Sequence, residues 1–520
     1  MPLRSLTWIG AVLGCAAGDP APPPAAPADT LSTPTDDTAM PVEPGDSGEP
    51  PPVPDACGTL LGVQVVGGSG LDSTQDLAVA ADGSWLVGGY FQGPVTFGAG
   101  TPAEVTLIPT GLADGLLARY AADGTFQWAT HLATPYSAAP EAVFATSDGG
   151  AVVVGFFYEA LTLAPGTPEE TAYASLGESD GFIARFDADG TLRWSTRIGG
   201  PGADFAIAGG VLADDSVMFA GLHRADAVFG AGEPLETTLF LPPLAFEAGF
   251  VAALAPDGSL AWAQPFGGTQ YAAAYAGKVD VLAQQLVLTG NVSGPGLAVF
   301  GAGQPGEVVV DPDGNNSFLA RWAGDGTLGA VATMLGASSA ALDVGGDGSV
   351  VVTGSFDDAV TFGPGEANET VLATEANEAV FVSRHAVDGS LLWAVLADAE
   401  PRSNAVGRGI TAMPDGGAVV TGDFTESIRF DPGGPAELSF QTAGGYDPYA
   451  ARFEASGALR CAVHIAGTGT DLGADARLLP DGTVLLTGNI DKSAQFSAGL
   501  VDKLWVSAEK LDGFLATYWF

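Results

Sequence analysis

The chain has 520 residues, with 18 lysines and arginines against 61 aspartates and glutamates, which gives a formal net charge of −43 at pH 7. Nucleic acids and anionic lipids bind to basic surfaces, so this composition excludes both as electrostatic partners. We interpret the charge as a solubilising acidic surface, with adaptation to a salt-rich habitat as the alternative.

The first fifteen residues have the pattern of an export signal. Arg4 precedes a short apolar run that ends at Cys15, and this run is too short to span a bilayer as a helix. Its end, Val-Leu-Gly-Cys, resembles a bacterial lipoprotein signal. That resemblance implies removal of residues 1–14 and lipidation of Cys15. We therefore expect an exported protein at the outer membrane or cell surface, with the lipid as its only membrane contact. An ordinary signal peptide cleaved nearby is the alternative.

Residues 15–56 are predicted to be a disordered tether. From residue 16 this segment holds twelve prolines and eight acidic residues, with no lysine or arginine. Such a chain buries too little apolar surface to fold and stays extended.

From residue 57 onward the sequence repeats. The stretch from Asp180 to Gly200 has two alternating runs joined by Asp-Gly, which predicts a β-hairpin. Copies of it recur every 63–68 residues, and each series of copies has seven members. The period fits a four-stranded unit with one long loop. The position of Arg185 recurs at Arg119, Ala253, Arg321, Arg384, Arg452 and Thr517.

These units resemble the bacterial seven-bladed β-propeller repeat proteins, over about residues 58–520. The resemblance implies an all-β, seven-bladed β-propeller for residues 57–520, and it implies no particular activity.

The repeat begins and ends with incomplete units, which predicts how the ring closes. Residues 60–66 match an outer strand, and residues 512–520 match a third strand. If the N-terminal strand completes the last blade, two exposed sheet edges disappear. Cys57 and Cys461 would then lie on adjacent blades. A disulfide between them and two free thiols both remain open.

Two residue types recur at fixed positions in the blades. We expect each recurrent arginine to pair with an aspartate of its own blade, such as Asp180 or Asp189, while a ring of arginines around an anionic ligand is the alternative. The arginines are Arg119, Arg185, Arg321, Arg384 and Arg452. The outer-strand tryptophans resemble the tryptophan-docking positions of quinoprotein propellers, in which the indole packs between blades. They are Trp128, Trp194, Trp262 and Trp393, and Ala330 and Cys461 interrupt the series. Because the chain has no adjacent cysteines, we expect no quinone cofactor.

The sequence contains candidate calcium ligands but no complete catalytic motif. Asp311, Asp313 and Asn315 have the alternate spacing of a calcium loop, as do Asp187 and Asp189, but short Asp-Gly turns explain such patterns too. No cofactor is expected beyond this candidate calcium site. The four histidines lie far apart, and no G-x-S-x-G motif lies between a strand and a helix. A carboxylate pair for glycoside hydrolysis stays open.

The leading functional hypothesis is a monomeric, non-enzymatic binding or scaffolding module displayed at the cell surface. Its ligand, a protein or a glycan, would bind on the loop-bearing face of the propeller. The alternative is a glycan-active hydrolase or lyase, which a buried carboxylate pair in a pocket would favour. A third hypothesis is a purely structural surface protein.

Overall fold

The regular elements of the described chain are all β-strands. The computed structural model describes residues 57–68, 70–268, 270–311, 314–496 and 503–520. Within these ranges, no helix of the length and apolarity needed to cross a bilayer occurs. The predicted signal peptide, residues 1–14, the tether, residues 15–56, and Cys15 lie outside them.

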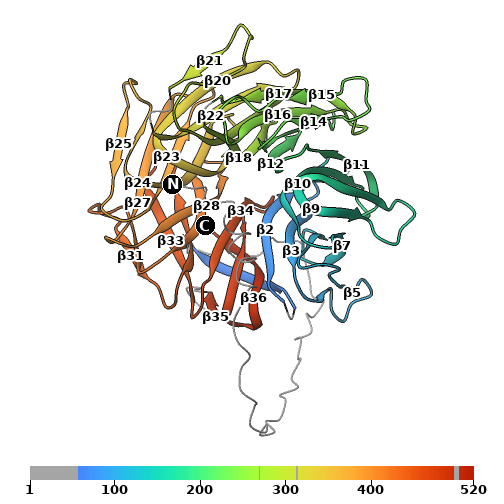
Figure 1. Ribbon diagram of the computed structural model, residues 1–520. Helices are drawn as coiled ribbons and strands as arrows, with labels where there is room; N and C mark the ends of the chain where they lie inside the picture. Colours follow the sequence, from blue (N-terminus) through green and yellow to red (C-terminus); the bar gives the residue numbers. More distant parts are fainter. Residues whose placement is uncertain (1–56, 69, 269, 312–313, 497–502) are drawn as a thin grey trace, which may run out of the picture. The chain divides into compact units, whose positions relative to one another are not determined.

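The strands form antiparallel blades arranged radially about a centre, which is a β-propeller (Figure 1). The sheet β12-β13-β16-β17 shows one blade by itself. The innermost strands are β2 (Asp72–Val79), β8 (Ala138–Ala145), β12 (Asp204–Val211), β18 (Tyr271–Asp280), the second half of β23 (Leu328–Val344), β28 (Ala405–Ala412) and β34 (Leu472–Leu478). The second strands are β3 (Trp85–Phe91), β9 (Ala151–Leu163), β13 (Val217–His223), β19 (Gln285–Ser293), β24 (Val350–Phe362), β29 (Ala418–Phe424) and β35 (Val484–Phe496).

The outer half of each blade follows the same order. The third strands are β6 (Asp114–Tyr120), β10 (Thr171–Phe186), β16 (Ala248–Leu254), β22 (Asn315–Ala323), β26 (Ala379–His385), β32 (Asp447–Phe453) and β36 (Lys503–Trp519). The outer strands are β7 (Phe126–Ala133), β11 (Leu192–Ile198), β17 (Leu260–Phe266), the first half of β23, β27 (Leu391–Ala399), β33 (Leu459–Gly467) and β1 (Thr59–Val66).

Short hairpins fill the long loops between second and third strands. Their separate strands are β4 (Val95–Phe97), β5 (Val105–Leu107), β14 (Ala227–Phe229), β15 (Thr237–Leu239), β20 (Ala298–Phe300), β21 (Val308–Val310), β25 (Thr370–Ala373), β30 (Ser427–Phe430) and β31 (Leu438–Gln441). The hairpin of β14 and β15 contacts the outer strands of two neighbouring blades. Val228 bridges to Gly199 at the end of one outer strand, and Glu233 accepts a hydrogen bond (2.6 Å) from the backbone N–H of Leu260 on the next.

Side-chain packing between blades forms the core. The second strands are buried on both faces, so they read as nearly continuous apolar runs: Val152, Val153 and Val154 are each 0% exposed. Phe229 and Phe250 meet edge to face with ring centroids 4.9 Å apart, a favourable aromatic geometry. Within the described chain, no hydrogen-bonded ladder joins the innermost strands of neighbouring blades.

The first and last strands of the described chain pair with each other. β1 runs antiparallel to β36, from Thr59 opposite Trp519 to Val66 opposite Gly513. This is the pairing expected from the two incomplete repeats. It covers a sheet edge that would otherwise be open to pairing with other chains.

Candidate functional site

The recurrent arginines pair with aspartates, but not with the aspartates expected from the sequence. Each guanidinium bonds an aspartate that precedes the second strand of its own blade. Four of these aspartates lie in the turn before that strand, and Asp280 is the last residue of β18. The pairs are Arg119–Asp82 (3.1 Å), Arg185–Asp148 (3.0 Å), Arg321–Asp280 (2.8 Å), Arg384–Asp347 (2.7 Å) and Arg452–Asp415. Asp180 and Asp189 were the wrong partners. Asp180 lies in the interior of β10, five residues before Arg185, where it accepts a backbone hydrogen bond from Leu176, and Asp189 caps its own turn through the N–H of Thr191.

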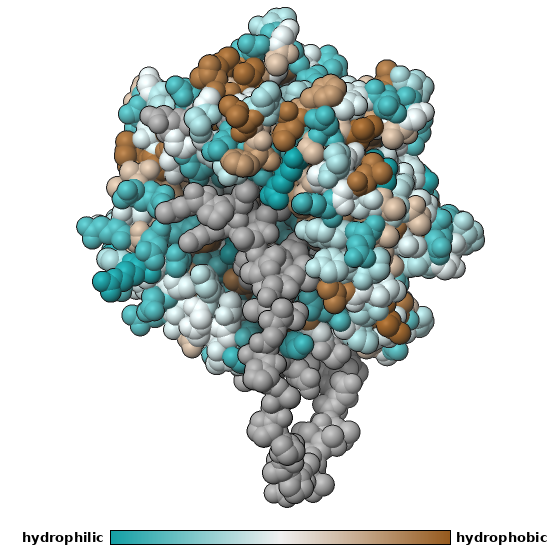
Figure 2. Space-filling view, in the orientation of Figure 1, coloured by the Kyte–Doolittle hydropathy of each residue, from teal (hydrophilic) through white to brown (hydrophobic). Residues whose placement is uncertain are grey.

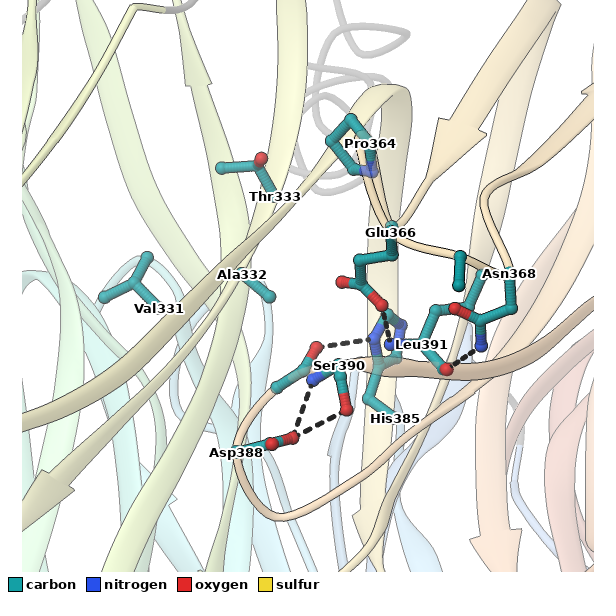
Figure 3. A pocket seen from close by; sticks show the side chains of 13 residues that line it. Val331, Ala332, Thr333, Pro364, Glu366, Asn368, His385, Asp388, Ser390 and Leu391 are labelled. Carbon is teal, nitrogen blue, oxygen red and sulfur yellow. Dashed lines mark hydrogen bonds between the residues drawn. The ribbon is translucent and has the colours of Figure 1, made fainter.

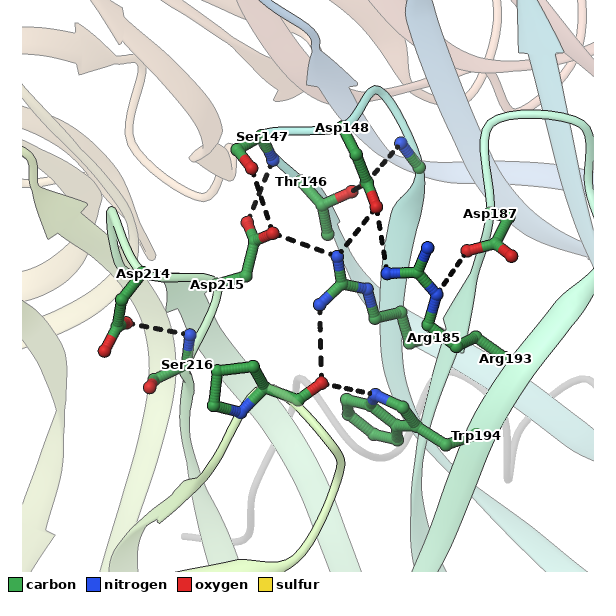
Figure 4. A network of polar contacts seen from close by, with 12 residues as sticks. Thr146, Ser147, Asp148, Arg185, Asp187, Arg193, Trp194, Asp214, Asp215 and Ser216 are labelled. Atoms are coloured by element: carbon green, nitrogen blue, oxygen red, sulfur yellow. Dashed lines mark hydrogen bonds and ion pairs between the residues drawn. The ribbon is translucent and has the colours of Figure 1, made fainter.

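Arg185 also joins two blades (Figure 4). Its Nη2 lies 3.0 Å from Asp148 and 3.0 Å from Asp215 of the next blade, and its side chain is only 2% exposed. Burial alone would raise the pKa of Asp148, but hydrogen bonds from Thr146 and Gly150 and the charges of Arg185 and Arg193 hold it at about 2. Because its guanidinium is already shared by two carboxylates, Arg185 stabilises the contact between the two blades and is not free to bind an anionic ligand.

The outer-strand tryptophans dock on the next blade. Each indole N–H donates to a backbone carbonyl in that blade's second turn, for example Trp194 to Pro256 (3.0 Å). The others are Trp128 to Ala188 (2.9 Å), Trp262 to Gly324 (2.7 Å) and Trp393 to Ala455 (2.9 Å). The ring covers a turn glycine two residues further on: Gly258 has φ +88°, and a Cβ there would lie 2.7 Å from the indole of Trp194. The tryptophans therefore have a structural role between blades.

A disulfide occupies one junction that lacks a tryptophan. Cys57 and Cys461 are bonded, with their Cα atoms 6.2 Å apart. Cys461 holds the tryptophan position of β33, and Gly58 takes the place of the turn glycine, since a Cβ on it would lie 4.0 Å from the sulfur of Cys461. The bond lies where an indole lies in other blades.

A second exceptional junction, at Ala330, is open. Here β23 offers only Ala330 and Ala332, whose Cβ atoms lie 3.9 and 3.3 Å from the place of a Cβ on Gly389. A cavity of about 560 Å³ remains. It is bounded by residues 331–333 of β23 on one side, and by hairpin residues 363–368 and turn residues 385–391 on the other (Figure 3).

The polar groups of this cavity are acidic or neutral. Glu366 accepts the N–H of Leu391 (2.8 Å), and Asp388 accepts the N–H (3.0 Å) and hydroxyl (2.7 Å) of Ser390. Burial lowers the pKa of His385 to about 4, so its imidazole is neutral at pH 7. No lysine or arginine is among the described residues that line the cavity.

The innermost strands share one irregularity. Each has an extra residue out of register with the second strand, a β-bulge, which redirects a side chain. The bulged residues are Gln75, Glu141, Ile207, Tyr275, Ala340, Arg408 and Ala474.

Charged side chains gather beside these bulges. Arg477 of β34 pairs with Asp475 (2.8 Å) and with Asp76 of β2 (3.2 Å), and Asp76 also accepts the N–H of Val143 (2.7 Å) from β8. Burial, reinforced by the nearby charge of Asp76, raises the pKa of Glu141 to about 8. A carboxyl that is protonated at pH 7 can donate a proton, so these two acids are the arrangement on which an enzymatic function would depend.

One loop presents apolar side chains to solvent, and sequence reasoning missed it. In the loop that leads from β15 into β16, Phe240 is 71% exposed, Leu244 94% and Phe246 57%. Leu244 has φ +76°, which is rare for a residue other than glycine. The loop is nonetheless anchored, because Phe246 donates its N–H to Gln270 (2.8 Å) and its ring stacks on Tyr271 with centroids 5.4 Å apart. The run Phe-Leu-Pro-Pro-Leu-Ala-Phe was the signal in the sequence.

The structure brings no metal site together in the part that it describes. There, no three histidine, cysteine, aspartate or glutamate residues are placed to hold an ion. Of the calcium candidates, Asp311 and Asn315 are described and Asp313 lies outside the described residues. In the other candidate, Asp187 pairs with Arg193 (2.5 Å).

The histidines lie in separate environments. His464 bonds Asp447 (2.7 Å), and burial lowers the pKa of both His131 and His223.

Comparisons with known proteins yield structural likenesses alone. No family model matches the chain, and no curated protein matches it significantly. Similar solved structures include the Dos1 propeller (8% identical, covering 88% of this chain and 94% of that chain, TM-score 0.41) and Saccharomyces cerevisiae Sqt1 (10%, 89% and 99%, TM-score 0.36). A mutant puromycin hydrolase is 14% identical, covering 80% of this chain and 58% of that one, with TM-score 0.35. All of these TM-scores are below 0.5, so the assignment of the propeller rests on the strand pairings above.

Proposed function

We propose that the protein is a non-enzymatic binding or scaffolding module: a propeller of seven blades, exported and held at the outer membrane or cell surface by a lipid on Cys15. Its contact surface is the loop of residues 240–246, on the side of the propeller that carries the long loops. The partner is a protein or a glycan that meets apolar side chains.

The observation that most directly supports this contact surface is the exposure of Leu244. Apolar residues scattered singly over a surface are common, but three in one short anchored loop form a patch, and such patches mark interaction sites. A backbone held at positive φ in a leucine costs about 1–3 kcal/mol, and strain of this kind concentrates at functional sites. In Figure 2 apolar surface is gathered over β14, β16, β17 and β20.

Site-specific crosslinking in the producing cell tests this proposal. A photoreactive phenylalanine analogue in place of Phe240 should give a discrete crosslinked product in the full-length protein, and Leu244→Ser should reduce its yield at least about tenfold. The matched control is Leu282→Ser, since Leu282 is 77% exposed but lies in the turn between β18 and β19. Parallel screening of a glycan array distinguishes the two partner classes. Absence of any product and of any glycan binding would contradict the proposal.

The second candidate is a glycan-active hydrolase or lyase, and it is favoured by Glu141, because burial and the nearby charge of Asp76 raise the pKa of its carboxyl to about 8. In that case Glu141→Gln should reduce turnover of a polysaccharide substrate by about 100-fold or more without lowering the melting temperature. If no polysaccharide is cleaved by the wild-type protein, the binding function stands alone.

The anchor has a separate test. Expressed in a bacterium with radiolabelled fatty acid, the wild-type protein should incorporate label, and Cys15→Ser should abolish it and release the protein from the membrane fraction. Continued labelling of the variant would contradict lipidation at Cys15.

A further inference from the structure

The cavity at Ala330 differs from its counterparts in one respect: no side chain of the described residues fills it. In four other junctions an indole covers the turn glycine of the next blade. At Ala330 the turn is the same, since Gly389 has φ +90° and Gly258 has φ +88°. The side-chain atoms nearest to a Cβ on Gly389 would be the methyl groups of Ala332 (3.3 Å) and Ala330 (3.9 Å). The surface that receives an indole elsewhere is therefore present here, and the indole is missing.

The hydrogen-bond acceptor of the missing indole is present as well. Trp194 donates to the carbonyl of Pro256, two residues before its turn glycine. The equivalent carbonyl belongs to Val387, two residues before Gly389. No hydrogen bond within the described chain engages it, whereas the neighbouring carbonyl of Ala386 accepts the N–H of Gly389 (2.9 Å).

The charge of the residues that line the cavity restricts the class of ligand further. Glu366 and Asp388 line the cavity, and each uses one carboxylate oxygen in its own hydrogen bonds. With His385 neutral and no cation among the lining residues, the local charge is negative, as is the charge of the whole chain. A ligand with a positive charge is favoured over a neutral or anionic one.

We propose that this cavity binds a small cationic indole, or a similar flat fused ring with an N–H donor and an ammonium group. The ring lies over Gly389 and donates to the carbonyl of Val387, while the ammonium group faces Glu366 and Asp388. Four tryptophans of the same molecule are the template for this pose. The site is distinct from the loop of residues 240–246, and it does not depend on the function proposed for that loop.

Tryptamine is the probe that tests the site, by isothermal titration with the full-length protein. We expect saturable binding at one site per chain. Indole-3-acetate, which has the same ring and the opposite charge, should bind at least about tenfold more weakly, corresponding to about 1.4 kcal/mol. Absence of saturable tryptamine binding, or equal affinity for the two ligands, would overturn the proposal.

Variants locate the binding. Ala330→Trp supplies the missing indole from within the chain, so it should reduce tryptamine affinity at least about tenfold while the melting temperature rises. Ala332→Leu narrows the same space and should also weaken binding. It serves as the second variant in case Ala330→Trp does not fold. Leu335→Trp, on the same strand but away from the cavity lining, is the matched control and should leave affinity unchanged. Wild-type affinity in both filled variants would refute binding at this place.

Discussion

At the scale of single residues, many acidic side chains serve the turns of the fold. One set of aspartates accepts the backbone N–H two residues ahead, which stabilises tight turns: Asp82, Asp123, Asp148, Asp189, Asp214, Asp257, Asp325, Asp347, Asp388, Asp415 and Asp481. A set of glutamates caps the hairpin turns: Glu104, Glu170, Glu236, Glu307, Glu369 and Glu437. This part of the negative charge thus follows from turn chemistry.

A pair of glycines tests the tryptophan docking. Gly258 (φ +88°) lies beneath Trp194, whereas Gly232 (φ +81°) has open space where a Cβ would go. Gly232→Ala should lower the free energy of unfolding by about 1–2 kcal/mol, the cost of positive φ for alanine. Gly258→Ala should cost about 1–3 kcal/mol more, because the methyl group overpacks against the indole. Denaturant unfolding measures both, and equal losses would show that the indole does not constrain the turn.

At the scale of elements, the sequence predicted what is local. Alternating runs and Asp-Gly turns lie within about twenty residues of each other, so the hairpins and the repeat could be expected from spacing. The pairing of β1 with β36 is not local, and it could be expected only because the repeat begins and ends with incomplete units. The predicted partner of Arg185 was wrong because its actual partner, Asp148, lies 37 residues earlier in the chain. The pairing of β9 with β10 brings the two side chains together. The cavity at Ala330 depends on which turn of the next blade faces an outer strand. The exposure and the positive φ of Leu244 depend on the path of a loop that has no periodic pattern. Neither follows from a single strand's pattern.

The disulfide is an element-scale device with a measurable effect. Cys57 and Cys461 are separated by 404 residues, so their bond links the closing strand β1 to the preceding blade. Closing so long a loop restricts the unfolded chain, and the expected stabilisation is about 2–5 kcal/mol. The double variant Cys57→Ser/Cys461→Ser should melt at a lower temperature than the wild type, and reductant should not lower it further. Mass spectrometry of the unreduced protein should yield the linked peptide. Two alkylatable thiols in the wild type would contradict the bond.

At the scale of the whole molecule, the contacts that join the first and last strands of the described chain act against the mutual repulsion of its acidic residues. Arg477 joins β34 to β2 through Asp76, and β1 pairs with β36, so an ion pair and a strand pairing join the first strands of the described chain to its last strands. The chain carries 61 acidic residues, and several are buried near the ends of strands. Self-repulsion and the burial of carboxylates both become more costly as these groups ionise, which makes stability a function of pH.

The sign of that dependence follows from three buried aspartates. Burial raises the pKa of Asp204 and of Asp471 to about 7, and that of Asp72 to about 6, from an ordinary value of 3.8. In each case the folded state binds its proton more tightly than the unfolded chain does. Their contribution to stability is therefore fully present below about pH 4 and is lost as pH rises through 6–7. Asp148, with its pKa lowered to about 2, acts in the opposite sense and contributes above about pH 4.

Stability should consequently be greatest at about pH 4, and the melting temperature should fall by several degrees from pH 5 to pH 8.5. Asp204→Asn mimics the protonated acid and keeps an oxygen for the N–H of Gly200, which Asp204 binds at 2.8 Å, so this variant should lose less on the same pH change. Asp189→Asn is the matched control, because Asp189 is exposed and should leave the slope unchanged. Added salt screens the general repulsion but not the buried groups. If 1 M salt removes the whole pH effect, or if Asp204→Asn melts with the wild-type slope, the buried aspartates are not its cause.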